Sequence, residues 1–140
     1  MSAFDRDLLA ERLLAVQRHL KRVADRLPES PAGLLPSSDA SDAVVLHLWQ
    51  ATQIVIDLAT GACVKWNLGT PATYADAFTR LAEAGIVDAE LAQRLKRAAG
   101  FRNLIAHAYE RLDMGRVHVA ATEGPADLLA LIAALRDWPA

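Results

Sequence analysis

Cysteine is nearly absent from this chain, since Cys63 is the only one among 140 residues. A lone thiol excludes an intrachain disulfide and is typical of a reducing compartment. The first residues lack a basic segment followed by an apolar run, so we expect no secretory signal. No stretch approaches about 18 uncharged apolar residues. We therefore predict a cytoplasmic protein that does not span a membrane.

Motifs for metals and cofactors are missing as well. The sequence has no Gly-rich phosphate loop, no Gly-x-Ser-x-Gly elbow and no zinc motif. His19, His47 and His118 show no ligand-like spacing to one another or to Cys63. We expect no metal site and no cofactor, so any chemistry has to come from the side chains themselves.

Charge is low overall but uneven along the chain. A net charge of −2 and a pI near 6.0 argue against a protein that coats nucleic acid indiscriminately, because that mode needs many phosphate contacts. Between Arg94 and Arg116, however, six basic residues stand against two acidic ones, a local charge of +4. Arg97 and Arg111 in this run are candidates for phosphate contacts. The alternative is a solvated basic helix face.

Apolar residues recur at helical spacing along nearly the whole chain. We predict helices over about residues 5–27, 42–65, 71–84 and 88–112, with a Pro- and Ser-rich loop at 28–38 and a last helix opened by Gly124-Pro125. Residues 116–120 alternate briefly as a strand would and are expected to form an extended loop. Without a repeat or linker, the chain is predicted to be one domain over residues 1–140. The expected fold is all-α, an antiparallel bundle of four or five helices.

Several residues are expected to set the helix ends. Ser38, Asp39 or Ser41 is the predicted cap of the second helix. Thr70-Pro71 is expected to begin the third helix, because threonine caps well and proline is favoured at the first helical position. Gly85 is expected to end it.

One run in the predicted fourth helix concentrates reactive groups: Arg102-Asn103-Leu104-Ile105-Ala106-His107-Ala108-Tyr109. It places a fixed cation, an amide, an imidazole and a phenol within two helical turns. Arginine binds phosphate bidentately, and histidine transfers protons near neutral pH. An Arg and a His at this spacing arise easily by chance, but Asn103 and Tyr109 make the longer pattern specific, since the chain has only two tyrosines. These are the groups that phosphodiester chemistry in RNA needs.

Helical phase predicts where these side chains point. At about 100° per residue, Arg102 lies within roughly 20° of Leu95 and Tyr109 on the apolar stripe, so we expect it to face inward. His107 lies about 140° from Arg102 around the same axis, too far for a compact site on one helix. A second copy of the helix across a two-fold axis would close the site. We therefore predict a homodimer through this helix, with residues from both chains lining one cleft.

The run from Arg102 to Tyr109 resembles the Arg-x4-6-His signature of HEPN-domain ribonucleases, in the Arg-x4-His-x-Tyr form of HepT toxins. Further stretches share the resemblance, and they are Ala51 with Asp57-Leu58-Ala59, residues 73–78, residues 81–86 and Phe101. The resemblance covers about residues 42–120 well and the first helix only by pattern. It implies a dimeric bundle of four or five helices that cleaves RNA without a metal.

The resemblance also implies a role for each residue and a partner. Arg102 and His107 would be catalytic, and Asn103 an accessory polar group. The protein would be the toxin of a type VII-like toxin–antitoxin system, encoded beside an MntA-like nucleotidyltransferase of the MNT family. Tyr109 would be the residue that this antitoxin modifies with AMP. The expected reaction is attack by a ribose 2′-hydroxyl, with a cyclic phosphate as product.

Other interpretations of the same residues remain open at this point. Arg102 is alternatively a structural arginine in a buried ion pair with Asp57 or Asp76. His107 is alternatively a surface histidine favoured by the helix dipole, and Tyr109 a residue that packs the dimer edge. The alternative functions are a non-catalytic helical module that binds a nucleotide or a partner protein, and a structural dimer that presents a nucleotidyltransferase.

Overall fold

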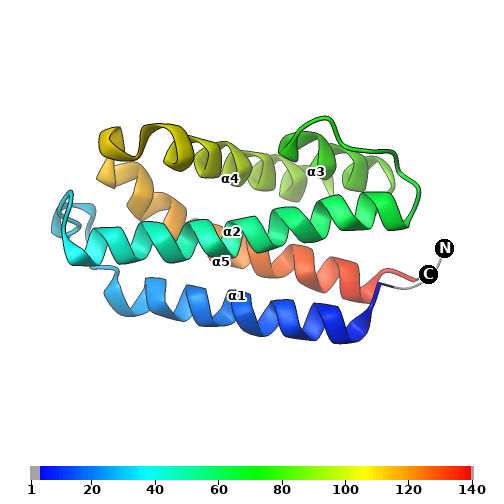
Figure 1. Cartoon of the computed structure of the whole chain (residues 1–140), viewed down its shortest axis with the longest axis horizontal. Coiled ribbons are helices and arrows are strands. Elements are labelled where there is room, and N and C mark those ends of the chain that lie inside the picture. Colours follow the sequence, from blue (N-terminus) through cyan, green and yellow to red (C-terminus); the bar gives the residue numbers. More distant parts are fainter. Residues whose placement is uncertain (1–3, 140) are drawn as a thin grey trace.

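The computed structural model describes residues 4–139, which form an antiparallel helical bundle (Figure 1). Its elements are α1 (Arg6–Arg26), α2 (Asp39–Lys65), α3 (Tyr74–Glu83), α4 (Ala89–Ala108) and α5 (Met114–Asp137), with short 3-10 helices η1 (Pro31–Gly33) and η2 (Tyr109–Arg111). No strand occurs within residues 4–139. The predicted all-α bundle is confirmed.

Side-chain caps fix where the helices begin. The Ser38 hydroxyl accepts from the Ser41 backbone N–H at 3.1 Å, and the Ser41 hydroxyl accepts from the Ser38 N–H at the same distance. Because of this reciprocal capping, α2 begins at Asp39, three residues before the predicted start. Its cap is Ser38, which is one of the three predicted caps. The predicted start of α3 was wrong, because Thr73 rather than Thr70 caps the helix, accepting from the Asp76 N–H at 3.0 Å. Gly85 ends α3 as expected, with a φ of 81°.

Residues 116–120 correct another prediction, since they are helical and not extended. Asp113 caps α5 by accepting from the Gly115 N–H at 2.8 Å, and the helix then continues past Pro125. Proline has no N–H to donate, and inside a helix it costs about 3 kcal/mol. Burial on both sides offsets this cost. Val117 and Ala121 are buried before the proline, and Leu128 and Leu131 after it.

Two buried clusters hold the bundle together around α2, which packs against α1, α3, α4 and α5. The larger cluster contains Phe78, Leu95 and Leu131. The smaller cluster includes Val44, Leu48, Ile105 and Val117. Ile105 lies inside the motif and is only 3% exposed, so the smaller cluster anchors the motif end of α4 to α2 and α5.

Two of the helices are long and apolar enough to cross a membrane by length and composition. An 18-residue window in α2 and another in α5 each have a mean hydropathy of 1.2. Half of the α2 window and a third of the α5 window are buried inside the bundle. Core helices of soluble proteins pass the same test, so this similarity is weak evidence for a membrane span.

Candidate active site

Arg102 lies on the inner side of α4, as helical phase predicted. Its Nε donates to Oε1 of Gln53 on α2 at 2.6 Å, and one terminal nitrogen donates to Oδ1 of Asn103 at 3.3 Å. The guanidinium carbon lies 5.7 Å from the centre of the Trp49 ring and 5.3 Å from that of Tyr74. Two aromatic faces and two amides therefore hold the cation.

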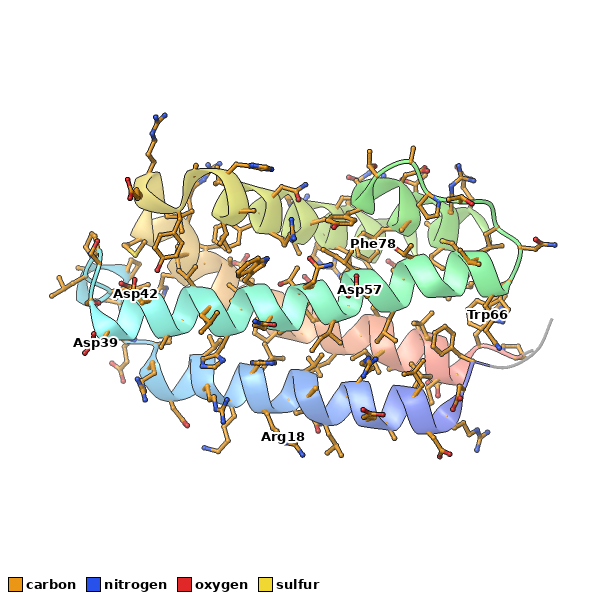
Figure 2. All side chains as sticks on the ribbon, viewed as in Figure 1. Arg18, Asp39, Asp42, Asp57, Trp66 and Phe78 are labelled. Carbon is orange, nitrogen blue, oxygen red and sulfur yellow. The ribbon has the colours of Figure 1, made fainter. Side chains whose placement is uncertain are left out.

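Gln53 is itself held in place. Its amide nitrogen donates to Oδ1 of Asp57 at 2.9 Å, one helical turn further along α2. A carboxylate only accepts hydrogen bonds, so the amide nitrogen has to face Asp57 and the amide oxygen is left for Arg102. Figure 2 shows Asp57 on the side of α2 that faces α3 and α4. Asp57 thus fixes the orientation of the Gln53 amide, and the Gln53 amide oxygen in turn fixes the position of Arg102.

The structure corrects the alternative of a direct ion pair at Arg102. Asp76 accepts from Nε of Arg80 at 2.9 Å, and Asp57 reaches Arg102 only through Gln53. Among residues 4–139, no carboxylate lies within ion-pair distance of Arg102. Neutral groups therefore hold the half-buried guanidinium, and no carboxylate competes with an anionic ligand such as a phosphate.

His107 and Asn103 lie one turn apart on α4, and both are exposed. Within the described chain, the His107 imidazole has no hydrogen-bond partner. Arg102 points toward α2 and α3, whereas His107 faces solvent, which agrees with the predicted divergence of the two side chains. One copy of α4 therefore presents the cation and the imidazole on different sides.

Tyr109 departs from the predicted phase. The α-helix ends at Ala108, and Tyr109 begins η2. Its hydroxyl donates to Oδ1 of Asp42 in the first turn of α2 at 2.5 Å, and the residue is 46% exposed. Gln53, the partner of Arg102, lies eleven residues further along α2, about 16 Å at 1.5 Å per residue. The expectation that Tyr109 shares the stripe of Arg102 was wrong.

The Asp42 carboxylate changes the acidity of Tyr109. The hydrogen bond to Asp42 raises the pKa of Tyr109 to about 12, with smaller contributions from burial and from the negative charge of Asp42. A negative neighbour disfavours the phenolate, so Tyr109 keeps its proton at neutral pH.

A groove of about 1030 Å³ runs between α4 and α5. Arg94, Arg97 and Arg116 line it together with three acidic residues, Asp113, Glu123 and Asp127. Arg94 pairs with Asp127 at 2.9 Å. The groove is thus balanced in charge and not basic, although Arg97 itself is exposed there and Arg111 is exposed on η2. Leu104 and Val119 add exposed apolar surface, at 38% and 51%.

The structure also brings together two histidines that the sequence spacing separated. The Nδ1 atoms of His19 on α1 and His47 on α2 lie 3.0 Å apart. Burial, followed by charge effects, lowers the pKa of both rings, with Arg22 contributing at each. Residues 4–139 contain no group of three or more His, Cys, Asp or Glu side chains arranged to hold a metal ion.

Sequence reasoning missed Asp42, Trp49 and Gln53. A signal was present, because Trp49, Gln53 and Asp57 are spaced four residues apart and so follow one face of α2. Polar residues on a face that also packs against neighbouring helices need a partner there. Arg102 is that partner.

The structure is thus a helical bundle that carries an Arg-x4-His motif at the end of α4. A family model described as "Ribonuclease HepT-like" matches residues 16–135. The chain belongs to the ribonuclease HepT-like family, and the resemblance stated from the sequence is confirmed.

Individual relatives agree with this assignment. The chain is 26% identical over 108 residues to the mRNA nuclease HepT of Shewanella oneidensis, covering 77% of this chain and 80% of the relative. It resembles the fold of the tri-AMPylated Shewanella oneidensis HEPN toxin in complex with MNT antitoxin, with a TM-score of 0.85, 23% identity, and coverage of 96% and 100% of the two chains. A toxin–antitoxin complex with AMP-PNP matches with a TM-score of 0.82, 23% identity, and coverage of 94% and 99%.

Proposed function

We propose that this chain is the toxin of a type VII-like toxin–antitoxin system and acts as a metal-independent endoribonuclease. The observation that carries this proposal is the Arg102 guanidinium, which neutral groups hold without a carboxylate partner. A buried or half-buried cation is costly unless something compensates it, and a substrate phosphate would do so. Its relative from Shewanella oneidensis is named an mRNA nuclease. The proposed compartment is the cytoplasm, where RNA and ATP are both present.

The proposed reaction uses two groups in turn. His107 takes the proton from a ribose 2′-hydroxyl, whose oxygen attacks the adjacent phosphorus while the 5′-oxygen leaves with a proton. Arg102 stabilises the negative charge that grows on the phosphorane. The Asn103 amide oxygen accepts from Arg102, so its amide nitrogen is left to orient the phosphate. The products are a 2′,3′-cyclic phosphate and a 5′-hydroxyl.

We propose that two chains form each working site. Arg102 and His107 face different sides of α4, so a second α4 has to supply the missing group. The groove between α4 and α5 suits an interface with a second copy, because it combines exposed Leu104 and Val119 with equal numbers of basic and acidic side chains. A two-fold interface pairs a surface with itself, so a surface with equal numbers of basic and acidic groups can face its own copy without net charge repulsion.

The antitoxin part of the proposal rests on Tyr109. We infer that a cognate MntA-like nucleotidyltransferase transfers AMP from ATP to the hydroxyl of Tyr109, a residue that is 46% exposed. A HEPN toxin of the same fold is tri-AMPylated in complex with its MNT antitoxin. The added phosphodiester brings negative charge to the end of the motif helix, which disfavours RNA binding.

Cleavage in the presence of EDTA tests the nuclease. The purified protein is expected to cut single-stranded RNA at an unchanged rate when all divalent cations are chelated, because its proposed catalytic groups are side chains. The products should carry 2′,3′-cyclic phosphate ends, detected by mass spectrometry of the fragments. Nucleotide binding without any RNA turnover would contradict the proposal and select the non-catalytic binding module.

Gln53 gives a second prediction, about positioning. Gln53→Ala is expected to lower kcat for RNA by about tenfold with little change in KM, because Arg102 loses the bond that orients it. Gln53→Glu should lower kcat further, since a carboxylate there neutralises Arg102 and repels Asp57. Gln50→Ala, at an exposed glutamine on the same helix, is the matched control and should leave kcat unchanged. Equal rates for Gln53→Ala and Gln50→Ala would show that Gln53 does not position Arg102.

A further inference from the structure

Asp42 and Tyr109 form an isolated pair at the surface of the bundle. The Tyr109 hydroxyl donates to Oδ1 of Asp42 at 2.5 Å, the short distance of a hydrogen bond to an ionised acceptor. Asp42 is exposed, and no cation in the described part of the chain pairs with its carboxylate. The carboxylate is therefore free of competing cationic partners among the described residues and is reachable by another protein.

Transfer of AMP to a phenol requires that the phenol lose its proton. With a pKa of about 12, Tyr109 holds only about one phenolate in 10⁵ molecules at pH 7. A reaction through preformed phenolate would be slow for that reason. The proton is lost more easily if a base accepts it while the new bond forms, because the hydroxyl becomes more acidic as its oxygen bonds to phosphorus, and free phenolate never has to form.

We propose that Asp42 is the general base for nucleotidylation of Tyr109, an inference that rests on the modification proposed above. The Tyr109 oxygen attacks the α-phosphorus of ATP and forms the phosphodiester bond. The bond between the α-phosphorus and the bridging oxygen breaks, and pyrophosphate leaves with that electron pair. The hydroxyl proton passes to Oδ1 of Asp42 and then to solvent. The toxin thus supplies a catalytic group for its own modification.

The position of Asp42 suits this role. It lies in the first turn of α2, directly opposite the start of η2, and reaches Tyr109 across 67 residues of sequence. Figure 2 shows Asp42 on the side of α2 that faces the end of α4, whereas Asp39 lies on another side of the same turn. Asp39 is also exposed and acidic. Asp39 is therefore a control that matches Asp42 in charge and also lies in the first turn of α2.

The test measures the initial rate of AMP addition by intact mass, with the cognate nucleotidyltransferase at saturation and ATP, from pH 6.5 to 9. At pH 7, Asp42→Asn is expected to be modified about 100-fold more slowly than the wild-type protein, within the usual range for a general base. The ratio of the wild-type rate to the Asp42→Asn rate should fall about tenfold for each pH unit. The variant depends on preformed phenolate, whose fraction rises about tenfold per unit of pH. Asp39→Asn should match the wild-type rate at every pH, and Tyr109→Phe should gain no mass.

Each other outcome has a defined meaning. A wild-type rate and pH profile for Asp42→Asn would overturn the inference while leaving the modification of Tyr109 in place. Equal slowing of Asp42→Asn and Asp39→Asn, or a pH-independent loss, would also overturn it, because lost charge or lost structure then explains the effect. No mass gain on the wild-type protein, or an equal gain on Tyr109→Phe, would refute the modification itself and the inference with it.

Discussion

Replacing His107 with alanine is expected to lower RNA cleavage by about 10²- to 10⁴-fold, the usual contribution of a positioned acid or base. The loss should fall on catalysis and not on folding, because the side chain is exposed and makes no hydrogen bond among the described residues. Arg102→Ala is expected to cost about 10²- to 10³-fold, as for other groups that stabilise transition-state charge. Single-turnover cleavage of a labelled RNA measures both effects.

Arg18→Ala is the control for these variants. Arg18 is an exposed arginine on α1, far from the motif in Figure 2, so its removal changes net charge without touching the site. Cleavage by Arg18→Ala should match that of the wild-type protein. Full activity of His107→Ala or Arg102→Ala would refute the assignment of the catalytic residues.

Mixed dimers show whether the two chains share each site. In a dimer of one Arg102→Ala chain and one His107→Ala chain, a shared arrangement leaves one intact pair of Arg102 and His107 and one site that lacks both. Such dimers are expected to recover about half of the wild-type activity. Dimers that stay inactive, or a monomer by light scattering at micromolar concentration, would contradict the shared site.

The second large effect concerns stability. Phe78→Ala is expected to lower the free energy of unfolding by about 3–5 kcal/mol, because it removes a large side chain that is 1% exposed in the main core and leaves a cavity. Urea unfolding followed by circular dichroism measures the change. Phe78→Leu keeps most of the volume and should cost clearly less. A loss below about 1 kcal/mol for the alanine variant would mean that α3 is not packed as described.

Phe78 also connects stability with the site. Its helix α3 carries Tyr74, whose ring flanks the Arg102 guanidinium. Loosening α3 should therefore weaken the hold on Arg102 as well. Packing of the core and placement of the proposed catalytic cation depend on the same short helix.

Local patterns predicted most of the fold. Spacings of three and four between apolar residues located all five helices, and a glycine marked the end of α3. The predictions failed where a local signal competed with packing. Gly124-Pro125 indicates a helix start, but Val117 and Ala121 are buried before it and keep the helix continuous. Thr70-Pro71 has the same signature as a helix start, yet Thr73 makes the capping bond.

The site was predictable only in part. Helical phase correctly predicted that Arg102 faces inward and that His107 points to a different side of α4, since both positions are set by one helix. The partners of Arg102 and Tyr109 lie 49 and 67 residues away in sequence, so no spacing along the chain encodes them. Tyr109 left the predicted phase because α4 ends one residue before it.

The bond between Tyr109 and Asp42 ties the segment after α4 to the beginning of α2, two elements that sequence connectivity does not join. An esterified phenol oxygen has no proton to donate, so addition of AMP abolishes this tie at the atom that was modified. The negative phosphodiester then lies beside the Asp42 carboxylate, so a hydrogen bond between the two residues is replaced by repulsion between two negative groups. A single nucleotide transfer would therefore break the contact between the end of α4 and the start of α2, and alter the mobility of the motif helix as well as its charge.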